Sequence, residues 1–337
     1  MKKYLILLSL LIPLLVMGLQ AQTVKVKVLG GQVTASAKEN IERDAANLLT
    51  SFNESILEDG KKLKDKLKMS FPDKVPANKA LINSIMDLWE QSPINCSVDL
   101  VEGNVLTLYG NRGYQLRDIP VNVLDADMNN SFQDMVLSFD NNGNLFEVNM
   151  QLEKHNYNNV IVNGVKEEDL VRRQMILDFI EVFRTAYNRK DIDYLKQVYS
   201  DDALIITGTV LKKKDRNKDE NLMLKGLGGQ KYQLVVQNKK EYIAKLKKIF
   251  SKNNYINIKF EEVSVIQHPT HEKIYGVTLK QFWNTSTYSD IGWLFLMVNF
   301  EDPMNPSIEV RTWQPHEYEG REIARDEVFN LDYFTVK

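Results

Sequence analysis

A carboxylate and a guanidinium stand two residues apart near the end of the chain, in the segment SIEVRTWQ. Side chains two positions apart on a regular strand share one face of the sheet, so Glu309 and Arg311 are predicted to lie side by side. Such a pair acts either as a structural ion pair or as the polar floor of a ligand pocket. The spacing alone leaves both interpretations open.

Large aromatic side chains accompany this pair in the neighbouring strand-like segments. Aromatic side chains line concave apolar pockets, but they also pack as ordinary sheet core. The predicted ligand-pocket residues are Tyr275, Gln281, Trp283, Trp293, Glu309, Arg311 and Trp313. If the protein is an enzyme, its reactive groups are expected in this set, without Trp293 and Trp313.

The histidines and acidic turns give no convincing metal site. His268, His271 and Glu272 in QHPTHEK have a spacing that metal ligands use, but they fall in a turn between two predicted strands, where exposed polar residues are common. Residues 140–144 (DNNGN) begin like a calcium loop, yet Gln151 occupies the twelfth position and strands flank the segment. We therefore assign no metal, no cofactor and no catalytic residue.

The composition excludes several classes of partner. The 337 residues carry a formal net charge of −2, so no electrostatic bias favours nucleic acid. The single cysteine, Cys96, excludes an intrachain disulfide, and its place at a strand start predicts a small core residue.

The first residues have the pattern of a secretory signal peptide, predicted to span residues 1–22. Lys2 and Lys3 precede an apolar run from Leu5 to Met17, and Ala21 offers a cleavage site before or near Gln22. The predicted location is periplasmic or secreted, with no membrane insertion after cleavage. A retained membrane anchor is the alternative.

Residues 274–314 determine how these candidates must be positioned. They form three strand-like runs, and the middle run, Trp293–Phe300, is almost wholly apolar, which predicts a strand covered on both faces. Helical periodicity covers residues 35–68, 78–91, 171–188, 191–199 and 239–251. Further strands are predicted at residues 23–29, 95–100, 105–109, 114–124, 132–139, 145–152, 204–207 and 256–265. Residues 212–229 are predicted to be an exposed loop.

The two halves of the chain repeat this order at a nearly constant offset of 160–162 residues. Lys79 aligns with Lys239, Phe139 with Phe300, and NKALINSIMDLW with NKKEYIAKLKKIF. A steady offset across a helix, a strand and a final hairpin favours an internal duplication. Two unrelated α+β domains with a similar order of elements are the alternative.

The second half resembles the nuclear transport factor two-like, or SnoaL-like, cone-fold superfamily. The resemblance covers residues 171–318 and rests on FIEVFRTAYNRKDIDYLKQVYSDDALI and on the closing WLFLMVNF and SIEVRTWQP. It implies a curved sheet wrapped around a cavity that helices close. It implies no single function, because the fold carries isomerases, dehydratases, ligand binders and scaffolds.

The predicted fold is α+β, with two tandem cone-like domains over residues 23–163 and 164–337, each with helices packed on a curved, mainly antiparallel sheet. The predicted function is that of an exported, non-catalytic ligand-binding or scaffold protein of the bacterial envelope. Its partner is expected to be a small molecule or an envelope protein. An isomerase or dehydratase acting on a small molecule in the C-terminal cavity is the alternative.

Overall fold

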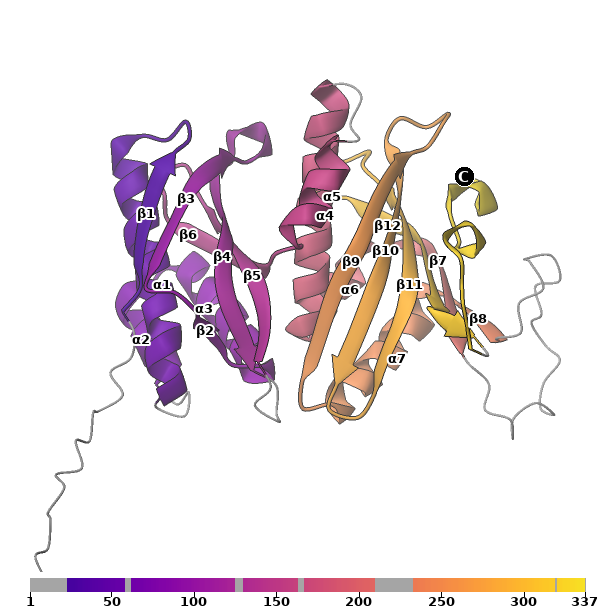
Figure 1. Cartoon of the computed structure of the whole chain (residues 1–337), viewed down its shortest axis with the longest axis horizontal. Helices are drawn as coiled ribbons and strands as arrows, with labels where there is room; N and C mark the ends of the chain where they lie inside the picture. Colours follow the sequence, from indigo (N-terminus) through magenta and orange to yellow (C-terminus); the bar gives the residue numbers. More distant parts are fainter. Residues whose placement is uncertain are drawn as a thin grey trace, which may run out of the picture.

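The computed structural model describes residues 23–57, 62–124, 130–162, 167–209, 233–318 and 320–336. These residues form helices and two six-stranded sheets with mixed strand directions, which confirms the α+β class (Figure 1). The predicted signal peptide and the predicted exposed loop at 212–229 lie outside the described residues.

The N-terminal half forms sheet 1 and the helices that cover one of its faces. Its elements are β1 (Lys25–Gly30), α1 (Ala35–Leu57), α2 (Leu63–Ser70), α3 (Pro76–Gln91), β2 (Ile94–Cys96), β3 (Leu100–Thr107), the 3₁₀ turn η1 (Tyr109–Asn111), β4 (Tyr114–Leu124), β5 (Asn130–Phe139) and β6 (Leu145–Met150). The strand order is β1-β3-β4-β5-β6, with β2 paired to β4. Only the β1–β3 pair is parallel.

The C-terminal half forms sheet 2. Its elements are α4 (Lys154–Val162), α5 (Glu167–Asn188), α6 (Ile192–Val198), β7 (Tyr199–Thr209), β8 (Gln233–Gln237), α7 (Lys239–Lys252), β9 (Ile256–Gln267), β10 (Ile274–Thr285), β11 (Ser289–Asn299) and β12 (Ser307–Pro315). The strand order is β8-β7-β12-β11-β10-β9, and the β7–β12 pair is parallel. A C-terminal segment follows, with β13 (Glu317–Tyr318), β14 (Arg321–Glu322), η2 (Arg325–Glu327) and η3 (Leu331–Tyr333).

Helices begin and pack where the apolar pattern predicts. The α1 stripe that includes Ile41, Leu48 and Phe52 is at most 1% exposed and packs on sheet 1. The helix predicted over residues 35–68 is described as two helices, α1 and α2, with residues 58–61 between them outside the described set. Asn238 and Glu241 form a reciprocal capping box at the start of α7, which satisfies two amides that the helix leaves unpaired.

Strand β11 is covered on both faces, as its continuous apolar sequence predicts. One face, which we call the inner face of sheet 2, packs against α5, α6 and α7 through residues such as Leu294 and Leu296. The outer face, which includes Phe295, lies under the C-terminal segment. Gly276 permits this cover, because a Cβ at this position would lie 2.7 Å from Leu331 Cγ.

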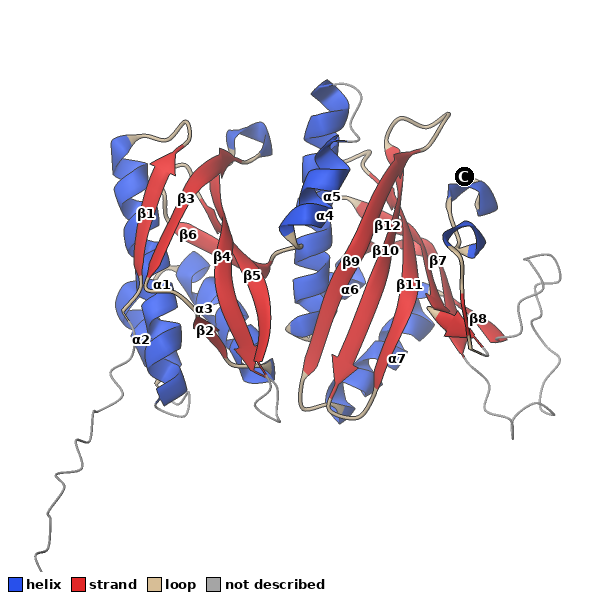
Figure 2. Ribbon diagram, in the orientation of Figure 1, coloured by secondary structure: helices blue, strands red, loops and turns tan. Residues whose placement is uncertain are grey.

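Helices α4 and α5 stand between the two sheets (Figure 2). The edge strand β6 of sheet 1 has backbone amides with no neighbouring strand, and α5 supplies their acceptors. The Met150 amide donates to Thr185 Oγ1 at 2.9 Å and the Leu152 amide, just beyond β6, donates to Glu181 Oε1 at 2.8 Å. Side chains of α5 thus protect an edge that would otherwise be open to pairing with another chain.

The edge strand β9 of sheet 2 is protected in the same way. Its Ile258 amide donates to Asn188 Oδ1 at 2.8 Å, and the Ile258 carbonyl accepts from Arg184 Nε at 2.7 Å. Asn156 on α4 accepts from the Val263 amide at 3.3 Å. Polar side chains of α4 and α5 therefore join two sheet edges that belong to different halves of the chain.

The element order recurs between the halves only in part. In both halves a helix precedes a four-stranded antiparallel meander: α3 with β3-β4-β5-β6, and α7 with β9-β10-β11-β12. The added strands differ, because β1 joins sheet 1 beside the first meander strand, whereas β7 joins sheet 2 beside the last. A shared meander is also what two unrelated α+β units would show, so the internal duplication stays a prediction.

Candidate functional site

The inner face of sheet 2 carries four of the residues predicted from the sequence, spread along β10 and β12. Gln281 and Trp283 follow Leu279 on β10 in regular alternation, and Leu279 belongs to the core under the helices. On β12, Arg311 pairs with Leu296 and Trp313 pairs with Leu294, both of which face the same core. Cross-strand partners share a face, so Gln281, Trp283, Arg311 and Trp313 all lie on the inner face.

The structure places the other three predicted residues elsewhere. Tyr275 is on the inner face but at the far end of β10, where its ring lies 6.0 Å from that of Phe300. Trp293 lies on the outer face, in the core under the C-terminal segment.

Regular alternation predicts that Glu309 and Arg311 lie side by side on one face, but the structure does not pair them. The register between β11 and β12 shifts between Val298, paired with Ile308, and Met297, paired with Val310, so Glu309 is the extra residue of a β-bulge. Its carboxylate accepts from Ser307 Oγ at 3.0 Å and forms no salt bridge with Arg311 among the described side chains.

Arg311 projects into a group of tyrosines contributed by the helices and by β7. Its guanidinium lies 5.0 Å from the centre of the Tyr242 ring. The Tyr187 hydroxyl bonds to the hydroxyls of Tyr242 at 2.8 Å and Tyr199 at 3.0 Å. Trp283 closes the group, with its ring 5.9 Å from that of Tyr187. The result is a buried cation among aromatic rings and hydroxyls.

Electrostatics keep this group in a defined charge state. Burial disfavours the charged form of Arg311, whereas the neighbouring Tyr242, Tyr187 and Tyr199, with a hydrogen bond to Tyr187, raise the pKa of the guanidinium. Burial raises the pKa of Tyr187 and Tyr199 well above the usual value, so both hydroxyls stay neutral near pH 7. The site therefore combines one fixed positive charge with neutral hydrogen-bonding groups.

Several buried polar atoms on this face have no hydrogen-bond partner among the described residues. Thr207 pairs with Trp313, and Gln237 pairs with Ile205, a residue of the inner core, so both belong to the same face. The unpartnered atoms are Thr207 Oγ1, Gln237 Oε1, Asp290 Oδ1, Arg311 Nε, Arg311 Nη1 and Trp313 Nε1. Buried polar atoms are normally hydrogen-bonded, so a cluster of unpaired donors and acceptors marks a place for a bound molecule or ordered water.

Asp290 is the acidic group of this face of the sheet. It pairs with Trp283 across β10 and β11 and therefore shares the inner face. Burial raises the pKa of its carboxyl, while a hydrogen bond from Tyr288 and the charge of Arg311 act in the opposite direction. Asp290 and Trp283 are both only partly buried, so their end of the face is the one nearest to solvent.

Sequence reasoning missed the helical part of this site. Tyr187 and Tyr242 fall on the buried stripes of α5 and α7, where they read as ordinary core residues. A signal existed, because a buried tyrosine hydroxyl normally needs a hydrogen-bond partner. Asp290, which lies inside β11, is likewise absent from the predicted residues.

The other candidate groups, two histidines and the cysteine, lie at a strand connection or in the core. His268 and His271 lie at the tip between β9 and β10, with ring centres 4.8 Å apart, and His271 is exposed. Within the described ranges, no group of three or more His, Cys, Asp or Glu side chains is arranged to hold a metal ion. Cys96 is 1% exposed and is a small core residue as predicted. No helix of the described residues is long and apolar enough to cross a membrane.

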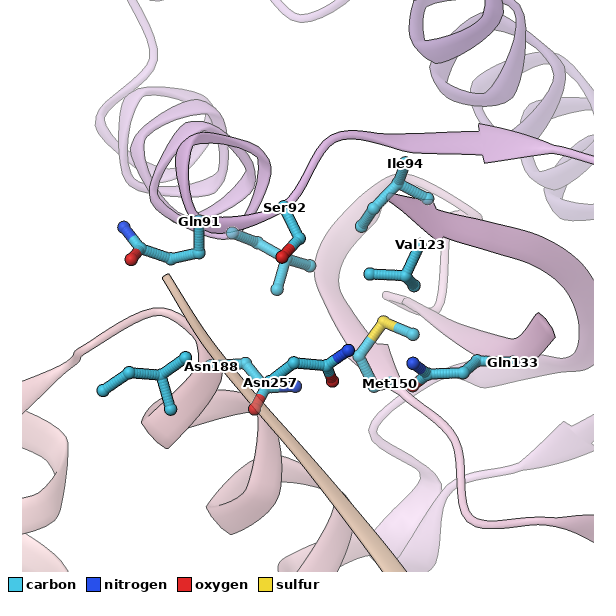
Figure 3. A pocket seen from close by; sticks show the side chains of 10 residues that line it. Gln91, Ser92, Ile94, Val123, Gln133, Met150, Asn188 and Asn257 are labelled. Carbon is cyan, nitrogen blue, oxygen red and sulfur yellow. The ribbon is translucent and has the colours of Figure 1, made fainter. Parts of the chain in front are cut away.

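A small cavity lies between the two halves of the molecule rather than on the inner face of sheet 2 (Figure 3). Gln91 and Ser92 at the end of α3, Gln133 of β5, Asn188 of α5 and Asn257 of β9 contribute polar groups to its lining. Its volume of about 10 Å³ provides room for about one water molecule. It is too small for an organic ligand.

Comparison with known proteins gives only weak similarity. Neither a protein-family model nor a curated protein matches the sequence. A Bdellovibrio bacteriovorus protein, Bd1075, is 18% identical with a TM-score of 0.33, over 46% of this chain and 44% of its own. A Cytophaga hutchinsonii protein described as NTF2-like is 16% identical with a TM-score of 0.28, over 43% of this chain and 98% of its own.

Naphthalene 1,2-dioxygenase with bound indole is 6% identical with a TM-score of 0.34, over 51% of this chain and 93% of the matched chain. Scores of this size do not define a family for the protein. Its function has to be argued from its own geometry.

Proposed function

We propose that the protein is an exported, non-catalytic protein that binds a small molecule on the inner face of sheet 2. The observation that carries this proposal is the cluster of unpartnered buried polar atoms around Arg311 and Trp313. A folded protein stabilises such atoms by hydrogen bonding, and a ligand provides the partners that the described chain lacks. The aromatic rings beside them supply the apolar surface on which a small organic molecule rests.

The binding proposal is tested with two matched threonine variants. Thr207 is on the inner face and Thr312 is on the outer face opposite Phe295, and both have an unpartnered buried hydroxyl. Purified protein is incubated with a metabolite library, and bound molecules are identified by native mass spectrometry. Thr207→Val is expected to reduce the retention of any ligand, whereas Thr312→Val is expected to leave it unchanged.

Hydrogen exchange locates the ligand independently. Added ligand is expected to slow exchange at residues 281–283 and 311–313. Protection confined to the N-terminal half or to the outer face of sheet 2 would instead favour a scaffold that binds a protein partner. That result would end the small-molecule proposal.

Export is proposed from the sequence of residues 1–22, whose charged start and apolar run have the form of a signal peptide. The mature chain is expected to begin at or near Gln22. N-terminal sequencing of protein recovered from the periplasm or medium provides the test. An intact Met1 in a membrane fraction would show a retained anchor.

The alternative is an isomerase or dehydratase that uses the same face. The specific observation in its favour is Asp290, a carboxyl with a raised pKa and an unpartnered oxygen on the face that holds Arg311 and the tyrosines. A carboxyl with a raised pKa is suited to proton transfer near neutral pH. Turnover that Asp290→Asn abolishes while binding persists would establish the enzyme.

A further inference from the structure

We propose that the molecule bound on the inner face of sheet 2 carries one carboxylate, and that this carboxylate binds the Arg311 guanidinium. The inference rests on the proposed small-molecule site and adds the chemical class of its ligand.

Two buried arginines have carboxylate partners within the chain. Arg117 on β4 donates from Nη2 to Glu181 Oε1 at 2.5 Å. Arg173 on α5 donates from Nε to Asp169 Oδ2 at 2.8 Å. This is the usual rule, because a charge taken out of water is stabilised only by close opposite charges or by several hydrogen bonds.

The other two buried arginines differ from each other. Arg184 is 2% exposed and has no carboxylate partner among the described residues, but it donates to the carbonyls of Ile258 at 2.7 Å and Gln151 at 2.8 Å and also bonds Gln133. Arg311 is 4% exposed, and its Nε and Nη1 have no acceptor among the described residues. Arg311 therefore has two buried donors that the described chain leaves unmatched, although its guanidinium also hydrogen-bonds Tyr187.

A second cation, the exposed Lys245 on α7, adds to the positive charge near Arg311. Burial lowers the pKa of Lys245 on α7, and the positive charge of Arg311 lowers it further, so the two groups are near enough to repel each other. The carboxyl on the same face is Asp290, which forms no salt bridge with Arg311 among the described side chains, and burial favours its neutral form. The local field therefore favours an anion that comes from outside the chain.

The surroundings favour a carboxylate on an apolar body. The guanidinium is one fixed charge, which a single carboxylate balances through charge-assisted hydrogen bonds. The partly exposed Trp283 presents an aromatic ring on the same side, packed against the buried Tyr187. Trp313 Nε1 adds a neutral donor. An inorganic phosphate would match the positive charge but would make no use of the aromatic surface.

The inference is tested with benzoate and benzamide, which have similar shapes and differ in charge. Isothermal titration calorimetry of the full mature chain is expected to show benzoate binding about tenfold or more tightly than benzamide. Arg311→Met is expected to weaken benzoate binding by a similar factor and to leave benzamide binding unchanged. Inorganic phosphate is titrated as the third probe.

Two lysine variants provide a readout that does not depend on how Arg311→Met folds. Lys245→Gln removes the second positive charge near Arg311, and a weakening of benzoate binding of roughly two- to threefold is expected. Lys248→Gln removes an exposed charge from the same helix and is the matched control. No change is expected in that variant.

The outcomes separate the inference from the proposed function. Equal binding of benzamide and benzoate would overturn the carboxylate assignment and leave the small-molecule site standing. Binding of phosphate without binding of benzoate would also overturn it. Failure of all three probes to bind would count against the site itself.

Discussion

At the residue scale, the informative positions are buried charges and buried aromatic side chains. Arg311 and Arg184 are similarly buried, yet the chain supplies hydrogen-bond acceptors for Arg184 and leaves two nitrogens of Arg311 unmatched. The difference matters because each unpaired buried donor lowers the stability of the folded state. Buried donors without acceptors in the described chain therefore indicate a candidate binding site.

Trp293 and Phe295 measure how much the outer cover of sheet 2 contributes to stability. Both are buried under the C-terminal segment, so Trp293→Ala and Phe295→Ala are each expected to lower the free energy of unfolding by about 3–5 kcal/mol. His268→Ala and His271→Ala at the β9–β10 tip are expected to cost less than about 0.5 kcal/mol. Denaturant melts of the four variants give the comparison, and a large loss at either histidine would indicate a buried network or a metal.

Asp178 on α5 gives a prediction about pH. Burial, and then the charge of Glu181, raise the pKa of its carboxyl from the usual 3.8 to about 7, although Arg117 lies 3.6 Å away. The folded state therefore holds a proton that the unfolded chain has lost, so this contribution to stability is complete below about pH 4 and is lost as pH rises towards 7. Gln115, Glu147 and Tyr157 are the other polar groups that influence this region.

Asp178→Asn removes this titration and retains the shape. The variant is expected to gain stability relative to the natural protein as pH rises, by up to about 1.4 kcal/mol for each pH unit across the window. Urea melts between about pH 5 and pH 8 measure the difference. Asp193→Asn, at an exposed position on α6, is the control. A constant difference across that range would show that Asp178 ionises normally.

At the element scale, α5 is the helix on which both halves depend. One side contributes Ile180 and Phe183 to the core of sheet 2. Glu181 and Thr185 accept hydrogen bonds from backbone amides at the edge of sheet 1. A helix with polar residues on a buried side is stable here because those residues meet strand amides that have no other partner.

Thr185 tests this account of the strand edge. Thr185→Val keeps the volume but leaves the Met150 amide without an acceptor, so a loss of about 1–3 kcal/mol is expected. Hydrogen exchange at Met150 is expected to accelerate, whereas amides inside β4 and β5 keep their protection. Thr107→Val, at an exposed position on β3, provides the matched control. Unchanged exchange at Met150 would refute the edge-capping role.

At the scale of the whole molecule, polar contacts join the two halves of the chain. In Figure 1, helices α1–α3 and sheet 1 lie on the left, α4 and α5 in the middle, and sheet 2 with the C-terminal segment on the right. The pair Arg117–Glu181 joins β4 to α5, and Lys259 of β9 pairs with Glu153. The Arg117–Glu181 contact is buried, whereas the Lys259–Glu153 contact is partly exposed.

Unfolding is expected to be a single cooperative transition. Loss of sheet 2 removes the core of α5, and loss of α5 leaves the β6 edge and the Arg117 charge without partners. Urea unfolding followed by hydrogen exchange at amides of β4 and β10 provides the test. Two separate transitions, one for each sheet, would show that the contacts between the halves contribute little to stability.

The sequence by itself determined most of the elements. Apolar periodicity predicted α1, α3, α5 and α7, and the continuous apolar run of β11 predicted a strand with both faces covered. These features depend on residues close together in the chain, where spacing alone fixes which side is apolar. The α+β class followed from them.

The tertiary structure alone decided which candidate residues meet. The bulge at Glu309 ended the regular alternation that had predicted a Glu309–Arg311 pair. Tyrosines from α5, β7 and α7 surround the buried Arg311, and the C-terminal segment covers Trp293 on the opposite face. Local periodicity carries no information on bulges or on contacts between distant segments, because both arise only when strands pair and faces are covered.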